Sequence, residues 1–153
     1  MTDDVALMRR TLEATALGIA HRAGPFGALV VDPSGAVIAV AVNDVLVRGD
    51  PTAHSEVNAI RRAAAVRRSP FLEGCTLVTT CAPCPMCAGA IHWARLARVV
   101  AAARADDAAA LGFVNGPPDW DPAAFLRACG IVYDADVERA AAVELLRRYD
   151  GPR

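Results

Sequence analysis

Two short stretches of this 153-residue chain carry residue types that can hold a metal ion. One is His54-Ser55-Glu56, which follows the turn Asp50-Pro51-Thr52, and the other is Pro83-Cys84-Pro85-Met86-Cys87. Cys84 and Cys87 are three residues apart, so their thiols face the same way on the first turn of a helix. A helix N-terminus favours thiolates, and proline suits a helix start. The spacing therefore predicts a pair of sulfur ligands at the start of a helix.

A catalytic zinc site needs three protein ligands and an open fourth position. We expect His54 to be the third ligand, because it also stands at the start of a predicted helix just after a turn. Glu56 lies at the mouth of the same helix, where it can reach a zinc-bound water without being a ligand. His-x-Glu followed by Pro-Cys-x-x-Cys resembles the signature of the zinc deaminases, in which the glutamate acts as general acid and base.

Cysteines at this spacing can also serve in roles without a metal. A redox pair would be expected in a thioredoxin-like context, and this role leaves His54 and Glu56 unexplained. A disulfide framework is disfavoured in a reducing compartment, and the five cysteines are an odd number. Small buried thiols are the remaining alternative, and we expect that role for Cys75, Cys81 and Cys129.

The composition predicts a single domain over residues 1–153, long enough to bury most of its apolar surface. Hydrophobic residues make up 54% and charged residues 22%, which excludes disorder for most of the chain. The first residues are acidic and lack a signal-peptide core, and the longest apolar run, residues 35–42, has the length of a strand. We therefore expect a cytoplasmic protein that does not enter a membrane.

The charge argues against a nucleic-acid partner. The formal net charge is −1, and all sixteen basic residues are arginines. Proteins that follow phosphate backbones usually carry a basic excess. The one dense basic cluster, within residues 61–68, is interpreted as a solvated helix face.

Hydrophobic periodicity predicts strands that alternate with helices after an initial hairpin around Pro33-Ser34-Gly35. Helices are expected over residues 3–21, 54–68, from the cysteine stretch to about 94, and 136–149, with a short one before residue 131. Strands are expected over residues 28–31, 36–42, 75–80, 97–101 and 131–133. This order is typical of an α/β sandwich with one mixed sheet.

The chain resembles the cytidine deaminase-like superfamily and, within it, the small bacterial guanine deaminases. The resemblance lies in GPFGALVV (24–31), DPTAHSEVNAIRRA (50–63) and CAPCPMCAGAIHWAR (81–95), and with the element order it covers about the first two thirds of the chain. It implies a three-layer α/β/α sandwich with a five-stranded mixed sheet, one zinc ion per subunit and a homodimer.

The resemblance also implies roles for residues around the metal. It makes His54, Cys84 and Cys87 the zinc ligands and Glu56 the proton shuttle. Backbone groups near Ser55 and Cys84 are expected to orient the leaving amine.

Three further residues match family positions that contact the substrate. Asn43 matches an asparagine that reads the base, although it could also be a turn residue before Asp44. Phe26 and Trp93 match aromatic positions that line the base pocket. Phe26 could instead attach its loop to the core, and Trp93 could be a core residue of its helix.

Two positions depart from the guanine deaminase pattern. Ala82 stands where a glutamate is common, and Gly112-Phe113-Val114-Asn115 replaces Gly-Phe-Asp-Asp, which carries a carboxylate toward the substrate. A carboxylate only accepts hydrogen bonds, whereas Asn115 can both accept and donate. Asn115 therefore predicts contact with a different ring edge from that of guanine. Trp120 is expected either as a local lid or as a plug under its loop.

These residues predict a zinc-dependent hydrolytic deaminase of a free nucleobase or related aminoazine. Conversion of guanine to xanthine and ammonia is the leading candidate. A cytosine or cytidine-type deaminase is the alternative, followed by a tRNA adenosine deaminase. A structural zinc protein is disfavoured, because such a site has no need of Glu56.

Overall fold

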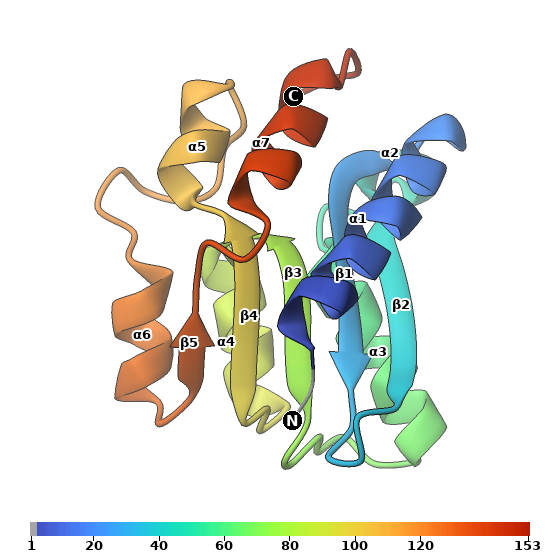
Figure 1. Cartoon of the computed structure of the whole chain (residues 1–153), viewed down its shortest axis with the longest axis vertical. Helices are drawn as coiled ribbons and strands as arrows, with labels where there is room; N and C mark the ends of the chain where they lie inside the picture. The colour runs from blue at the N-terminus through green and yellow to red at the C-terminus, as the bar shows by residue number, and fades with distance from the viewer. Residues whose placement is uncertain (1–2) are drawn as a thin grey trace.

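The computed structural model describes residues 3–153, which form a five-stranded sheet with helices on both faces (Figure 1). The strands are β1 (Gly24–Val31), β2 (Val37–Asn43), β3 (Thr76–Cys81), β4 (Arg98–Ala103) and β5 (Val132–Asp134). The helices are α1 (Asp4–Ala20), α2 (Val45–Arg48), α3 (Ser55–Arg67), α4 (Pro85–Trp93), α5 (Ala105–Ala110), α6 (Pro122–Ala128) and α7 (Arg139–Arg148). The predicted α/β/α sandwich with a mixed sheet is confirmed.

The sheet changes direction at its centre. Its strand order is β2-β1-β3-β4-β5; β1 runs antiparallel to both β2 and β3, while β3, β4 and β5 are parallel. Antiparallel neighbours can be joined by a tight turn, as β1 and β2 are, whereas parallel neighbours need a crossover. Helix α4 supplies that crossover between β3 and β4.

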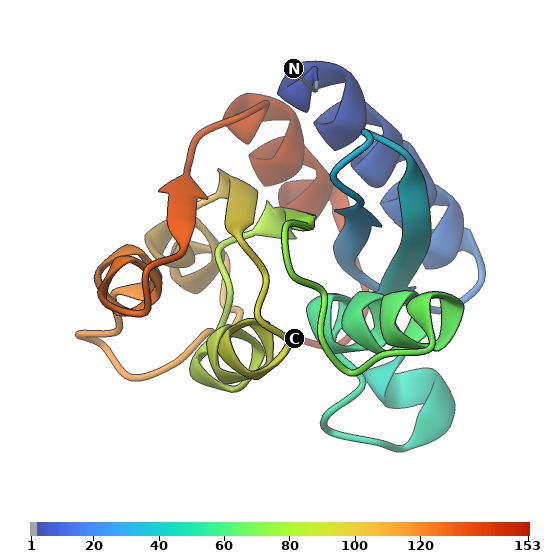
Figure 2. The same ribbon diagram turned by 90° about the horizontal axis from the view of Figure 1, so that it is seen from below.

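Two apolar clusters fill the space on either side of the sheet. Ala59 of α3, Ile91 of α4 and Leu126 of α6 belong to one cluster. Met8 of α1 and Leu146 of α7 belong to the other. Figure 2 shows the same division, with α1 and α7 across the sheet from α3 and α4. Burial of these apolar side chains is the main stabilising contribution.

The fold brings the starts of α3 and α4 to one end of the sheet. Strands β2 and β3 end there, at Asn43 and Cys81, and β1 begins there, with Gly24 paired to Asn43. His54 and Cys84 are the N-cap residues of α3 and α4. The residues between β2 and α3, and between β3 and α4, therefore meet at one edge.

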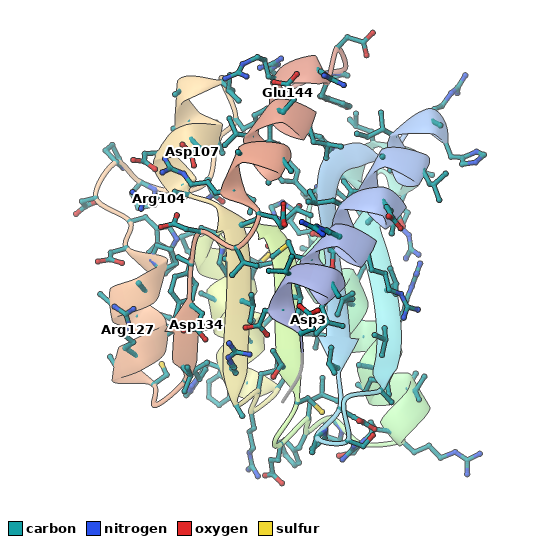
Figure 3. All side chains as sticks on the ribbon, in the orientation of Figure 1. Asp3, Arg104, Asp107, Arg127, Asp134 and Glu144 are labelled. Carbon is teal, nitrogen blue, oxygen red and sulfur yellow. The ribbon has the colours of Figure 1, made fainter. Side chains whose placement is uncertain are left out.

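Ion pairs connect the C-terminal elements at the same end. Arg104 and Asp107 lie at the start of α5 (Figure 3), where the Arg104 backbone N–H donates to Asp107 at 2.9 Å. Arg139 at the start of α7 donates two hydrogen bonds to the Asp107 carboxylate, at 2.7 and 2.8 Å. These contacts hold the pKa of Asp107 below its usual value, with Arg139 as the main cause.

Element boundaries differ from the prediction in two informative places. Helix α7 begins at Arg139 rather than 136, because Asp136 and Glu138 have positive φ angles of 68° and 56°, which an α-helix does not allow. Strand β1 begins at Gly24 rather than 28. The pairing with β2 shifts its register between Gly24 and Gly27, so the strand continues through this glycine- and proline-containing stretch. Within residues 3–153, none of the helices is long and apolar enough to cross a membrane.

Candidate active site

The three predicted metal ligands converge at the starts of α3 and α4. His54 Nδ1 lies 3.6 Å from Sγ of Cys84 and 3.6 Å from Sγ of Cys87, and the three ligand atoms all lie within 4.8 Å of one another. In a tetrahedral site with Zn–S of about 2.3 Å and Zn–N of about 2.0 Å, sulfur and nitrogen ligands are about 3.5 Å apart, close to the distances seen here. His54, Cys84 and Cys87 are therefore positioned to bind a zinc ion.

Local helix chemistry explains why the two thiols converge on His54. Cys84 is an N-cap in extended conformation, Pro85 opens the helix, and the Cys87 N–H donates to Cys84 Sγ at 3.5 Å. Hydrogen bonds from the Cys87 side chain and then from His54 lower the pKa of Cys84 to about 4, although its burial opposes them. The bond to Cys84 and burial raise the pKa of Cys87. The hydrogen bond to Cys84 likewise raises the pKa of His54.

Glu56 is buried beside these ligands, with 6% of its surface exposed. Its Oε2 accepts a hydrogen bond from Ser55 Oγ at 2.9 Å, and its Oε1 accepts one from Thr79 Oγ1 at 3.2 Å. Burial is the main cause that raises its pKa. A buried carboxyl with a raised pKa next to a metal site is typical of a general acid and base.

Thr79 was not predicted from the sequence. It lies on β3 and is 1% exposed, with the neighbouring Cys81 carbonyl as a second acceptor at 3.0 Å. Leu77, two residues earlier, belongs to the apolar cluster on the α3 side of the sheet. Because side chains alternate along a strand, Thr79 points to the same side. The sequence offered one signal for Thr79: a polar residue two positions after Leu77, on the same face of the strand and at its end.

A cavity of about 350 Å³ opens beside the metal ligands. His54 and Glu56 line one part of it, and Phe26, Asn43 and Asn115 line other parts. The structure thus brings these three predicted substrate residues to the site. The volume falls in the range of small-ligand pockets.

Trp93 lies outside this cavity. It is the last residue of α4, 77% of its surface is exposed, and its ring packs against His92 at a centroid distance of 5.2 Å. Cys84 and Cys87 occupy the opposite end of this nine-residue helix. The expected contact between Trp93 and the base pocket is therefore not made within one chain.

Trp120 packs under its loop as a plug. Its Nε1 donates to the Pro83 carbonyl at 2.9 Å, and its ring lies 5.7 Å from that of Phe125. It lines a second cavity, of about 520 Å³, that shares Ala82 and Asn115 with the first. It does not line the cavity beside the metal ligands.

The last residues of the chain form a wall that sequence reasoning missed. Tyr149, Pro152 and Arg153 line the cavity next to Phe113. Arg153 donates to the backbone carbonyls of Leu111 and Tyr149, and its guanidinium lies 4.9 Å from the Phe113 ring centroid. No periodic pattern follows the last helix, so nothing in the sequence places these residues.

Comparison with known proteins identifies the family. Residues 1–103 match the sequence model of the cytidine and deoxycytidylate deaminase zinc-binding region. The chain belongs to this family. The predicted relation to the cytidine deaminase-like proteins is thus confirmed, and the three converging ligands agree with the zinc site that names the family.

Several relatives and solved structures are similar to this chain. Guanine deaminase of Bacillus subtilis is 53% identical over 90 residues, which cover 59% of this chain and 57% of that protein. The tRNA(Ile)-lysidine synthase of Deinococcus deserti is 42% identical over 110 residues, 69% of this chain and 21% of that protein. The matched part thus spans about half or less of the length of these curated relatives.

The fold is shared with solved structures over nearly the whole chain. A structure of guanine deaminase from Nitrosomonas europaea has a TM-score of 0.91 and 36% identity, covering 97% of this chain and 85% of that one. A structure in complex with 2,6-diaminopurine has a TM-score of 0.93 and 36% identity, covering 99% and 85%.

Proposed function

We propose that the protein is a zinc-dependent deaminase that converts guanine to xanthine and ammonia. The observation that carries this proposal is the buried Glu56, held by two hydroxyl groups next to His54, Cys84 and Cys87 and open to a cavity. The similarity of the chain to guanine deaminases of two organisms supports guanine as the substrate.

The residues of the site have separate tasks in this reaction. A zinc ion held by His54, Cys84 and Cys87 supplies Lewis-acid activation of the attacking water. Glu56 takes a proton from that water and delivers it to the ring nitrogen next to the amino-bearing carbon. The water oxygen bonds to that carbon, and Glu56 then passes a second proton, from the new hydroxyl group, to the departing amine as the C–N bond breaks. One water is consumed, ammonia leaves and a carbonyl remains.

The cavity walls fit a planar ring. Phe26 packs edge-on against Phe113 at a centroid distance of 5.3 Å, which gives an apolar, aromatic side to the pocket. Asn43 and Asn115 supply amide groups for the base edge. We propose that Phe26, Asn43 and Asn115 bind the base, and that the Ser55 backbone helps to orient the leaving amine.

Ammonia release from the zinc-loaded protein tests the proposal. The panel is guanine, cytosine, cytidine, adenine, adenosine, aminopterins, aminotriazines and a tRNA anticodon stem-loop. We expect guanine to be turned over, and Glu56→Gln to abolish turnover with one zinc still bound. Glu13→Gln, the same change on the exposed face of α1, is the control. Turnover of another substrate with guanine inert would contradict the substrate, and activity retained in Glu56→Gln would contradict the mechanism.

We further propose that two copies pair through α4. Met86, Gly89, Ala90 and Trp93 are spaced to share one face of this helix. Met86 and Trp93 are 37% and 77% exposed, and a side chain added at Gly89 would meet nothing within 4 Å. Large residues flank two small ones, so an antiparallel copy can approach closely. Light scattering should show a dimer that Trp93→Glu dissociates, while Leu17→Glu, at a similarly exposed apolar residue of α1, should leave it intact.

We also propose that the protein consists of one domain and acts in the cytoplasm on a small molecule. Both apolar clusters pack on one sheet. A nucleic-acid partner is disfavoured because Arg147 and Arg148 near the end of the chain are both paired with Glu144, at 2.7 and 2.6 Å, on α7 (Figure 3).

A further inference from the structure

Two of the metal ligands stand just outside the helices that they open. His54 and Cys84 are the N-cap residues of α3 and α4, and both have an extended backbone, with φ and ψ of −67° and 153° and of −70° and 170°. Because an N-cap residue lies outside the helical range, the chain that leads into it also determines where its side chain leaves the backbone. The peptide unit is planar. A carbonyl that is fixed just before each ligand therefore helps to fix that ligand.

The carbonyl before His54 is held by a buried side chain of α3. Asn58 Nδ2 donates to the Ala53 carbonyl at 3.1 Å and to the Val42 carbonyl at 3.0 Å, and 3% of the Asn58 surface is exposed. A side-chain amide has two N–H hydrogens, so one is available for each carbonyl. The Asp44 N–H is a second donor to Ala53, at 2.9 Å. Asn58 thus joins the end of β2 to the residue that precedes His54.

The carbonyl before Cys84 is held from a different part of the chain. Trp120 Nε1 donates to the Pro83 carbonyl at 2.9 Å, from the connection between α5 and α6 (Figure 1). Asn115 in the same connection donates to the Ala82 carbonyl at 3.0 Å. Proline has no N–H, so its carbonyl is the one backbone group through which hydrogen bonding can fix Pro83. Within residues 3–153, Trp120 is the sole donor to that carbonyl.

We propose that Asn58 and Trp120 are positioning residues of the metal centre, and that they hold His54 and Cys84 at the separation a zinc ion requires. His54 Nδ1 and Cys84 Sγ are 3.6 Å apart, although they belong to separate helices. Each of the two side chains fixes the backbone that leads into one of these ligands. The inference deepens the proposed function and rests on it for its catalytic consequence, because Glu56 works beside the same ligands.

Trp120→Phe is the first test, because it removes the N–H and keeps an aromatic ring under the loop. Loss of a group that orients a metal ligand typically weakens metal binding 10- to 100-fold. Trp120 acts through the backbone, so we expect the lower end, a zinc dissociation constant about tenfold higher by chelator competition. Trp93→Phe is the matched control at the far end of α4, and it should leave zinc affinity unchanged.

Asn58→Leu tests the other half of the pair with a side chain of similar size. The Ala53 carbonyl keeps the Asp44 N–H, so the effect should be smaller, about a threefold higher zinc dissociation constant. Asn58 and Trp120 share no hydrogen-bond partner, so the effects should multiply to about 30-fold in the double variant. Wild-type zinc affinity in either folded single variant would overturn the proposal.

A destabilised control separates positioning from a merely structural role. Leu126 belongs to the apolar cluster against which Trp120 packs. Leu126→Val should lower the free energy of unfolding of the zinc-free protein, measured in urea, and leave the zinc affinity of the folded protein unchanged. Circular dichroism checks that each variant is folded before zinc is added. A loss of zinc affinity in Leu126→Val as large as in Trp120→Phe would overturn the proposal, since loosened packing alone would then explain both.

The failure of this inference can be told from failure of the proposed function, because zinc binding is measured without substrate. If the wild-type protein binds zinc but does not deaminate guanine, the proposed substrate is wrong, and the zinc affinities of the variants still decide between positioning and packing. If wild type deaminates guanine while Asn58→Leu and Trp120→Phe bind zinc as tightly as wild type, only the positioning role is overturned.

Discussion

Replacing Thr79 with valine is expected to slow deamination while leaving substrate binding unchanged. Thr79 Oγ1 donates to Glu56 Oε1, and valine keeps nearly the same shape without the hydroxyl. Thr79 does not line the cavity, so it acts through Glu56 rather than on the substrate. It is a positioning residue in the proposed mechanism.

The size of the effect follows from the geometry. A hydrogen bond to a charged group contributes about 1.5–3 kcal/mol. The Thr79 bond is long, at 3.2 Å, and its single hydrogen has a second acceptor in the Cys81 carbonyl at 3.0 Å. We therefore expect the lower end, about 1.5 kcal/mol, which corresponds to roughly a tenfold lower kcat.

Steady-state kinetics on the zinc-loaded protein measure this effect, with the zinc content checked for each variant. Thr79→Ser keeps the hydroxyl and should restore most of the lost rate. Thr15→Val is a matched control, because Thr15 is also fully buried and donates to a backbone carbonyl, that of Thr11, at 2.7 Å. It should leave kcat unchanged.

Three results would refute this reasoning. One is a valine variant with the wild-type kcat. Another is a serine variant as slow as the valine variant, since only the shape would then matter. The third is an effect confined to KM, which would place Thr79 in substrate binding.

Three further predictions concern packing, the metal and the pocket wall. A methyl group on Gly27 would collide with Thr15 Oγ1, so Gly27→Ala should lower the free energy of unfolding by about 1–3 kcal/mol in urea titrations, and adding Thr15→Ala should recover most of it. Zinc needs both thiolates and a neutral His54, and the pKa values of Cys87 and His54 are both raised, so binding must release at least one proton; zinc affinity measured by chelator competition should rise at least about tenfold per pH unit near neutrality, and a flat profile would contradict this. Arg153→Gln loses the contact with Phe113 and should raise KM about threefold at constant kcat; a lower kcat instead would contradict a role in the wall.

The metal site was predictable because its information is local. His54, Cys84 and Cys87 each lie within the first turn of a helix or at its cap, and turns and prolines mark helix starts in a sequence. Once the crossover order of the sheet is known, the two helix starts must lie at the same end. The sequence therefore predicted that the three ligands and Glu56 lie close together, as they do in the structure.

The wall of the cavity was not predictable in this way, because it depends on how segments that are far apart in the sequence pack against one another. Arg153 reaches the cavity only through the packing of the residues after α7 against Leu111. The orientation of Asn115 depends on a hydrogen bond to one backbone carbonyl, that of Ala82, which has no signature in residue type. The start of α7 was misplaced because Asp136 and Glu138 have positive φ angles, which residue type and hydrophobic periodicity do not indicate.

The division of the ligand set between two helices has a consequence for folding. His54 and Cys84 are 30 residues apart and belong to elements on either side of a strand. An ion held between them is a cross-link that closes this loop in the folded chain and is absent from the unfolded one. Its loss would remove the proposed catalytic centre and would also loosen the contact between α3 and α4. Selection for chemistry and selection for a stable fold then act on the same three side chains.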